Sequence, residues 1–223
     1  MPDLRAAVVI DYQNVHLTGH GRFDSTRFGP KHEALIDPLS FAQQLLQVRN
    51  ARQRDGASKA VLRLVDVYRG LPSADHEPRA YARNLAQKSR WERDKRVIVN
   101  HRPLRYRYQR DANGQAVIDP KTGLRVPVGR PDEKGVDVLC ALALVRHARR
   151  DDIDLVILAS LDSDLIPALD EAVLTGTKVE TFSWWSPTQH GFEMHLSDRS
   201  RRLWNTRLNE QEFLCCIDRT DYS

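Results

Sequence analysis

The chain has 223 residues, of which 41% are hydrophobic, enough to build the core of a single domain. Its 34 basic residues slightly exceed its 30 acidic ones, giving a formal charge of +4 and a pI near 9.1 that favour a polyanionic partner. The longest apolar run, 138–145, is too short to span a membrane and three cysteines exclude a disulfide framework, so we expect a cytoplasmic protein without a membrane partner.

The first half of the chain alternates apolar strands with amphipathic helices. The apolar run from Ala6 to Ile10, followed by Asp11, predicts a short strand buried on both faces of a parallel sheet. The next segment is polar and rich in glycine, so we expect a long connection there. The further elements expected in this half are helices over 38–52 and 77–94 and strands over 60–68 and 96–100.

After residue 100 the pattern becomes that of a hairpin. Leu104 to Tyr108 alternates with period two, Asn113-Gly114 is a strong turn signal, and a second turn is expected over 119–123. We therefore expect a β-ribbon inserted at about 102–130 in an α/β domain that spans 1–189.

The second half of the chain resumes the alternation of helices and strands. The expected elements are a helix over 135–149, a strand over 154–160, a helix over 163–175 and a strand over 178–183. This alternation predicts a three-layer α/β/α sandwich around a mostly parallel sheet. Apolar residues within 190–223 predict a C-terminal helical extension packed on that domain.

Four aspartates fall at the carboxyl end of the predicted sheet. Asp11 ends the first strand, Asp137 opens the helix over 135–149, and Asp162 and Asp164 follow the strand over 154–160. Such sheets bind ligands beyond the carboxyl ends of their strands, where several carboxylates repel one another unless a cation intervenes. Because the ligand atoms are oxygens, the sequence predicts a site for Mg²⁺ or Mn²⁺, which suit phosphate chemistry.

Other polar residues beside these acids have supporting roles in this interpretation. Asn14 could orient Asp11, and Lys134 could neutralise the site or contact phosphate. Ser160 or Ser163 could donate a hydrogen bond to a carboxylate or a phosphate. The structural alternative is that each aspartate caps a helix or interacts with its dipole.

Three short motifs resemble the NYN domain family, a branch of the PIN-like nuclease superfamily. They are Val9-Ile10-Asp11-Tyr12-Gln13-Asn14, Lys134-Gly135-Val136-Asp137-Val138 and Ala159-Ser160-Leu161-Asp162-Ser163-Asp164-Leu165-Ile166-Pro167, followed by Gly176. The resemblance covers the core to about Ser183. It implies a PIN-like sandwich, dependence on Mg²⁺ or Mn²⁺, and ribonuclease activity, with Asp11, Asp137, Asp162 and Asp164 at the matching metal-binding and catalytic positions.

The sequence also departs from the pattern of this family. Leu161 stands where many relatives have glycine, and Leu165 stands where they have phenylalanine. Ala143 and Leu144 lie where the family's helix often carries a further acid. The missing acid leaves the number of metal ions open.

The predicted ribbon carries alternating basic and aromatic side chains. Strand geometry would place Arg105 and Arg107 on one face and Tyr106 and Tyr108 on the other. The arginines can bind phosphates of a nucleic acid, and the tyrosines can stack on unpaired bases. Tyrosines packed against the domain are a nearly equal alternative.

These features predict a metal-dependent endoribonuclease that hydrolyses phosphodiester bonds of single-stranded or loop RNA by in-line attack of water on phosphorus. A non-catalytic RNA-binding or scaffold module with the same fold is the first alternative, because the further helix acid is missing. A nucleotide-sugar transferase is the second, since Asp162-Ser163-Asp164 is also an acid-x-acid metal motif. The sequence leaves the RNA, the physiological metal and the oligomeric state open.

Overall fold

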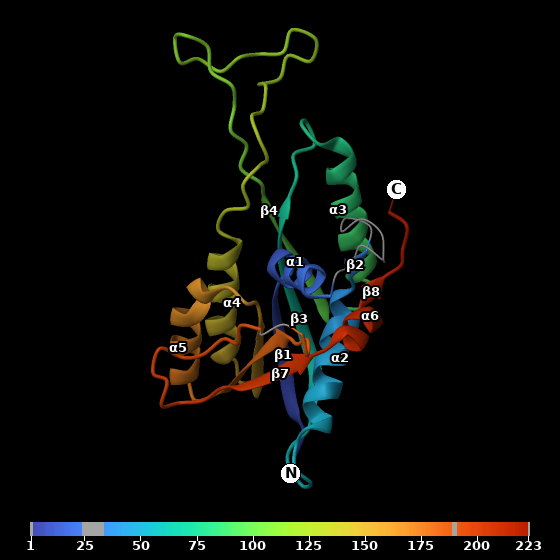
Figure 1. Cartoon of the computed structure of the whole chain (residues 1–223), viewed down its shortest axis with the longest axis vertical. Helices are drawn as coiled ribbons and strands as arrows, with labels where there is room; N and C mark the ends of the chain where they lie inside the picture. Colours follow the sequence, from blue (N-terminus) through green and yellow to red (C-terminus); the bar gives the residue numbers. More distant parts are fainter. Residues whose placement is uncertain (1, 24–33, 189–190, 223) are drawn as a thin grey trace.

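The computed structural model describes residues 2–23, 34–188 and 191–222, and its centre is a sheet covered by helices on both faces (Figure 1). The strands lie in the order β4-β3-β1-β5-β6-β7, and every neighbouring pair is parallel. This arrangement confirms the predicted three-layer α/β/α sandwich. The strands of this sheet are β1 (Leu4–Asp11), β3 (Ala60–Leu71), β4 (Val97–Pro103), β5 (Leu155–Ala159), β6 (Lys178–Trp184) and β7 (Trp204–Leu208).

The helices divide between the two faces of the sheet. One face is covered by α4 (Val136–Ala148) and α5 (Ile166–Leu174), and the other carries the remaining helices (Figure 1). Within the described ranges, no helix is both long and apolar enough to cross a membrane. The helices of the second face are α1 (Tyr12–Arg22), α2 (Pro38–Ala51), α3 (Pro78–Trp91) and α6 (Glu210–Cys215).

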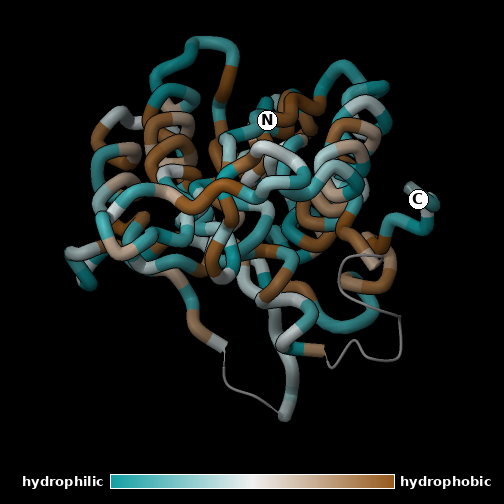
Figure 2. The backbone as a smooth tube through the Cα atoms, turned by 90° about the horizontal axis from the view of Figure 1, so that it is seen from above, coloured by the Kyte–Doolittle hydropathy of each residue, from teal (hydrophilic) through white to brown (hydrophobic). Residues whose placement is uncertain are grey.

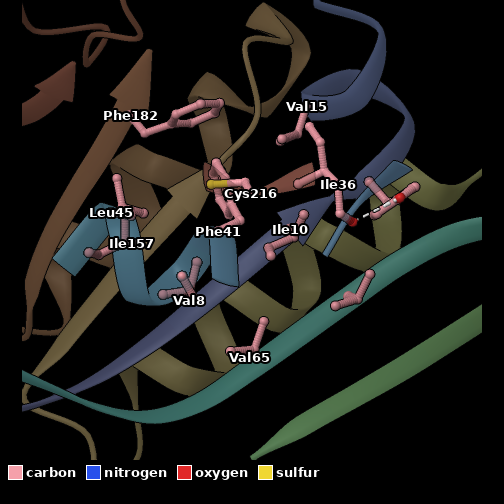
Figure 3. Close-up of a cluster of buried hydrophobic side chains, with 14 of the residues drawn as sticks. Val8, Ile10, Val15, Ile36, Phe41, Leu45, Val65, Ile157, Phe182 and Cys216 are labelled. Carbon is pink, nitrogen blue, oxygen red and sulfur yellow. Dashed lines mark hydrogen bonds between the residues drawn. The ribbon is translucent and has the colours of Figure 1, made fainter. Parts of the chain in front are cut away.

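Each face of the sheet has its own hydrophobic core, which explains the continuous apolar run in β1. Val8 and Ile10 belong to a cluster with Phe41 of α2 (Figure 3). Val9 belongs to the opposite cluster, which includes Leu144 of α4. Seen along the long axis, hydrophobic segments gather toward the middle of the molecule (Figure 2). Because both faces of β1 are buried, its polar residues are confined to its ends.

A buried ion pair joins α2 to β6. The Nη2 atom of Arg49 lies 2.9 Å from Oε1 of Glu180, and the two side chains are 0% and 1% exposed. The Nη1 atom of Arg49 also donates to the carbonyl of Ser58. Since both charges are removed from water, Arg49 depends on Glu180 for its compensation, while Nζ of Lys178 lies 3.5 Å from Oε1 of Glu180 as a second cation.

The segment after β1 differs from the prediction of a long connection, because α1 begins directly after Asp11. Asp11 is the N-cap of α1, and its Oδ1 accepts a hydrogen bond of 3.3 Å from the backbone N–H of Asn14. The buried face of α1 includes the polar side chains of His16 and His20, so the apolar spacing of an amphipathic helix is weak there. Residues 29–30 of the predicted connection lie outside the described ranges.

The C-terminal segment also differs from the prediction, since it is not a purely helical extension. It contributes β7 to the edge of the central sheet, followed by the short helix α6. The next strand, β8 (Ile217–Asp218), pairs antiparallel with β2 (Leu35–Ile36). Thr206 and Leu208 are fully buried, and their period-two spacing suits a strand. Residues 204–208 therefore complete the main domain.

The predicted β-ribbon insertion is confirmed, and it projects from the carboxyl end of the sheet beyond β4 (Figure 1). Arg105 and Asp132 exchange two backbone hydrogen bonds of 2.8 Å, which pairs the two arms of the ribbon at its base. Further out, the ribbon ends in two loops (Figure 1). Gly114 and Gly123 lie in these turns with φ values of 79° and 70°, which favour glycine.

Candidate functional site

The acidic motifs meet where the strand order of the sheet reverses. From β1 the chain first builds β3 and β4 on one side, and then crosses to build β5, β6 and β7 on the other. In the pairing of β1 with β5, Ile10 lies opposite Ala159, so Asp11 and Ser160 follow at the same edge. Open parallel sheets bind ligands at such a reversal point.

Ser160 links the first acidic motif to the last one. Its hydroxyl donates a hydrogen bond of 3.2 Å to Oδ2 of Asp11 and accepts one of 3.1 Å from the backbone N–H of Asp162. Ser160 is fully buried, and Asp11 is 7% exposed. The predicted supporting role of Ser160 toward a carboxylate is therefore seen in the structure.

Asn14 holds the same two motifs together from α1. Its backbone N–H donates to Asp11, while its side-chain Oδ1 accepts a hydrogen bond of 2.8 Å from the backbone N–H of Leu161. The side chain of Asn14 thus acts on the loop after β5, and only its backbone contacts Asp11.

Asp137 reaches the site from the first turn of α4. The helix begins after Gly135, whose φ of 79° is left-handed and strained for any side chain. A Cβ atom at Gly135 would also lie 2.9 Å from Nε of Arg102, which donates to the carbonyl of Lys134. This turn places Asp137, half-buried, and Lys134, exposed, on one cleft.

That cleft has a volume of about 910 Å³ and brings together three of the four predicted aspartates, Asp11, Asp137 and Asp162. Asp164 and Ser163 are exposed and do not line it. Asp162 caps the short 3₁₀ turn at 163–165, and the Oδ1 atom of Asp162 accepts from the backbone N–H of Asp164. The capping of the structural alternative is thus seen at Asp162, while Asp164 lies in the first turn that Asp162 caps and outside the cleft.

Glu133 is an acid of this cleft that the sequence analysis did not identify. Its Oε1 accepts a hydrogen bond of 2.6 Å from the backbone N–H of Gly70, at the end of β3. A Cβ atom at Gly70 would collide with Leu104 and lie 3.2 Å from Cδ of Glu133, so a side chain there would displace both. The available signal was the position of Glu133 four residues before Asp137.

The helix positions where the family resemblance suggests a further acid are closed to the cleft. Ala143 and Leu144 are 0% exposed, because they lie on the buried face of α4 within the hydrophobic core. Glu133, and Asp132 in its ion pair with Arg107, instead supply further carboxylates to the cleft from the loop before α4.

Burial and mutual repulsion raise the pKa values of two of these acids. The pKa of Asp11 is raised to about 6, chiefly by removal from water and also by the charges of Asp162 and Asp137, and hydrogen bonds from Asn14 and Ser160 offset part of this rise. Burial raises the pKa of Glu133 to about 7, and the charge of Asp11 adds to the effect. A bound cation would relieve the repulsion between these groups.

The donor atoms of the cleft suit a hard divalent cation. Asp11, Asp137 and Asp162 offer carboxylate oxygens, which Mg²⁺ and Mn²⁺ prefer. Across residues 2–23, 34–188 and 191–222, however, no three His, Cys, Asp or Glu side chains already form a group that could hold a metal ion. The chemistry of the residues fits the ion, and binding it requires their side chains to converge.

The ribbon presents its alternating residues on opposite faces, as predicted. Arg105 and Arg107 are exposed, whereas Tyr106 and Tyr108 are half-buried. Arg107 lines the cleft and forms an ion pair of 2.7 Å with Asp132. The ribbon therefore brings one cationic side chain, that of Arg107, to the edge of the acidic cleft.

Tyr106 follows the packing alternative raised for the two tyrosines. Its hydroxyl donates to Oε1 of Glu77 over 2.6 Å and accepts from the backbone N–H of Ser73 over 2.9 Å. The rings of Tyr106 and Tyr108 also lie 5.0 Å and 5.5 Å from the ring of His76. The tyrosines thus fix the base of the ribbon to the loop between β3 and α3.

Comparison with known proteins identifies no family. No family model matches the chain, and no curated protein matches it. A crystal structure of a protein of unknown function from Vibrio parahaemolyticus aligns over 81% of this chain and 81% of its own, with 19% sequence identity and a TM-score of 0.42.

Proposed function

We propose that this protein is a cytoplasmic, metal-dependent endoribonuclease of the NYN type that hydrolyses phosphodiester bonds in single-stranded or loop RNA. The observation that carries the proposal is that Asp11, Asp137 and Asp162, from three separate segments, line one cleft at the strand-order reversal. The same cleft is lined by the cations Arg107 and Lys134.

The carboxylates would repel an RNA phosphate, so phosphate chemistry in this cleft needs a counter-charge. Asp11, Asp137 and Asp162 would hold Mg²⁺ or Mn²⁺, which supplies Lewis-acid stabilisation and lowers the pKa of water near the phosphate. Ser160 and Asn14 keep Asp11 and the loop at 161–162 in place. Arg107 and Lys134 would bind the neighbouring phosphates of the strand.

A non-catalytic RNA-binding module is the second candidate, and the structure offers one observation in its favour. In the described part of the chain, no three of the acids lie close enough together to hold a metal ion. The nucleotide-sugar transferase is less well supported, because Asp162 faces the cleft whereas Asp164 does not, so the two acids do not act as one acid-x-acid motif.

A cleavage assay with purified protein tests the proposal. Labelled RNA that contains one hairpin, and a linear counterpart of the same composition, are incubated with Mg²⁺, Mn²⁺ or EDTA. The expected result is cutting that requires the metal, with faster cutting of linear RNA and of the loop than of the stem. Metal-independent binding without cleavage would favour the non-catalytic module, and equal cutting in stem and loop would contradict the single-strand preference.

A further inference from the structure

A second cavity lies beside the acidic cleft, between α1 and α3. It has a volume of about 320 Å³, and its wall is shared with the cleft through Gln13, Leu17 and Glu133. Asp11 lines the cleft and Tyr12, the next residue, lines the cavity. A strand that occupies the cleft therefore has a second concave site directly next to it, at the small end of the range for ligand sites.

Asn84 lines this cavity, and the oxygen of its side-chain amide is an unsatisfied hydrogen-bond acceptor. Its Nδ2 donates to the carbonyl of Ala80 over 2.8 Å, which fixes the orientation of the amide. The Oδ1 atom is buried and accepts no hydrogen bond from the described residues, and the whole residue is 9% exposed. A buried acceptor without a donor is unfavourable, so this wall of the cavity is suited to a ligand that carries an N–H group.

Two arginines make the cavity cationic. The guanidinium of Arg69 lies 4.6 Å from the centre of the Tyr12 ring, and its Nη1 donates to Oε1 of Gln87 over 2.8 Å. Arg83 lies half-buried on the wall of the cavity contributed by α3. Neither arginine forms an ion pair with a carboxylate in the described ranges. The cavity thus combines positive charge, an N–H acceptor and the apolar side chains of Leu17, Leu35 and Leu104.

We propose that this cavity binds one unpaired nucleobase of the RNA strand, with a base N–H donated to Oδ1 of Asn84 and the adjoining phosphate bound by Arg83. The proposal rests on the function proposed above and specifies its substrate. The phosphate belongs near Arg83 because Glu133, on the shared wall, would repel it. A base inside a duplex has its N–H groups already paired, so this site selects single-stranded RNA.

Binding of free nucleotides tests this site without any cleavage. The four ribonucleoside monophosphates and their nucleosides are titrated into the full chain in EDTA, and heat is measured by calorimetry. Asn84→Leu should weaken both kinds of ligand at least about tenfold, because it removes the acceptor at nearly constant volume. Arg83→Gln should weaken the monophosphates but leave the nucleosides unchanged. Arg90→Gln, an exposed arginine on the same helix, is the charge-matched control and should change neither.

The outcomes separate this site from the nuclease proposal. Absence of monophosphate binding to the wild-type protein, or equal affinities in the wild type and Arg83→Gln, would overturn the site. If Asn84→Leu does not fold, Arg83→Gln still tests the site, because it changes a partly exposed side chain. RNA cleavage with unaltered nucleotide binding in both variants would reject the base site alone. Nucleotide binding that both variants weaken, in a protein that cuts no RNA, would retain the base site and reject the nuclease.

Discussion

Asn14 accepts a hydrogen bond of 2.8 Å at its Oδ1 from the backbone N–H of Leu161, and so joins two segments that lie 147 residues apart in the sequence. Asp162 follows Leu161 directly, so this bond helps to set the position of the acid in the cleft. Groups that orient metal ligands without binding the metal are often as necessary as the ligands themselves.

Asn14→Ala should lower the rate of RNA cleavage by about ten- to a hundredfold, because the loop that carries Asp162 loses its anchor on α1. Steady-state cleavage with saturating Mn²⁺ measures the effect. Gln43→Ala, which removes an exposed amide on α2, is the control and should cleave at the wild-type rate. A wild-type rate for Asn14→Ala would show that this bond does not position the site.

The raised pKa of Asp11 predicts how the metal-free protein responds to pH. With a pKa of about 6, Asp11 keeps its proton in the folded protein up to about pH 6, whereas the unfolded chain releases it near the ordinary pKa of 3.8. The contribution of Asp11 to the free energy of unfolding is therefore full below pH 3.8 and is lost as the pH rises through about 6. Because one pKa unit corresponds to about 1.4 kcal/mol, the loss should approach about 3 kcal/mol by pH 7.

Urea unfolding in EDTA between pH 4 and pH 8 checks this prediction. Asp11→Asn does not titrate, so its advantage over the wild type should be close to zero near pH 4 and grow toward neutral pH. Comparing the two proteins at each pH cancels the titration of groups that do not interact with Asp11, so the difference reports Asp11 together with its coupling to Glu133. A difference that does not change with pH would contradict the assigned burial and repulsion at Asp11.

The buried ion pair of Arg49 and Glu180 should contribute more to the free energy of unfolding than the exposed pair of Arg149 and Glu171. Glu180→Gln leaves the guanidinium buried without its counter-charge and should reduce the free energy of unfolding by about 3–5 kcal/mol. Glu171→Gln breaks the exposed pair with Arg149 and should cost less than about 1 kcal/mol. Urea denaturation gives both values, and similar losses in the two variants would refute the difference.

The ribbon should contribute affinity for RNA through its exposed arginines. The double change Arg105→Gln and Arg107→Gln should lower the slope of log affinity against log salt by about 1.4 for single-stranded RNA, if each arginine contacts one phosphate. Fluorescence anisotropy across a salt series, in EDTA to prevent cleavage, measures the slope. The control is the pair Arg149→Gln and Arg150→Gln, which lies after α4 and should leave the slope unchanged. An unaltered slope in the ribbon variant would mean that it faces away from the RNA.

The parts of the fold that were predictable are those whose burial leaves a clear local pattern. Strands buried on both faces, such as β1 and β5, give continuous apolar runs, and the polar residue that ends each run marks the carboxyl edge of the sheet. Asp11 and Ser160 were found in this way, and Asp162 follows two residues after Ser160. In contrast, α1 buries His16 and His20, and β7 buries Thr206, so their patterns do not match simple hydrophobic periodicity.

The missed features of the site depend on contacts between distant segments. Glu133 is held by the backbone of Gly70, 63 residues away, and no local pattern marks that bond. Asp164 resembles Asp162 in sequence, but the 3₁₀ turn at 163–165 points them to different surroundings. Tertiary structure, rather than residue type, decides which acids enter the cleft.

The most direct test of the account is the cleavage rate of Asp11→Asn and of Asp162→Asn with saturating Mn²⁺. Each substitution removes a charged oxygen donor with little change in volume, and the control Asp151→Asn makes the same change at an exposed position before β5, at the opposite end of that strand. The account predicts that both cleft variants stay folded, as judged by circular dichroism, and lose cleavage by more than about a hundredfold, while Asp151→Asn cuts RNA normally. Wild-type rates in either cleft variant would contradict it.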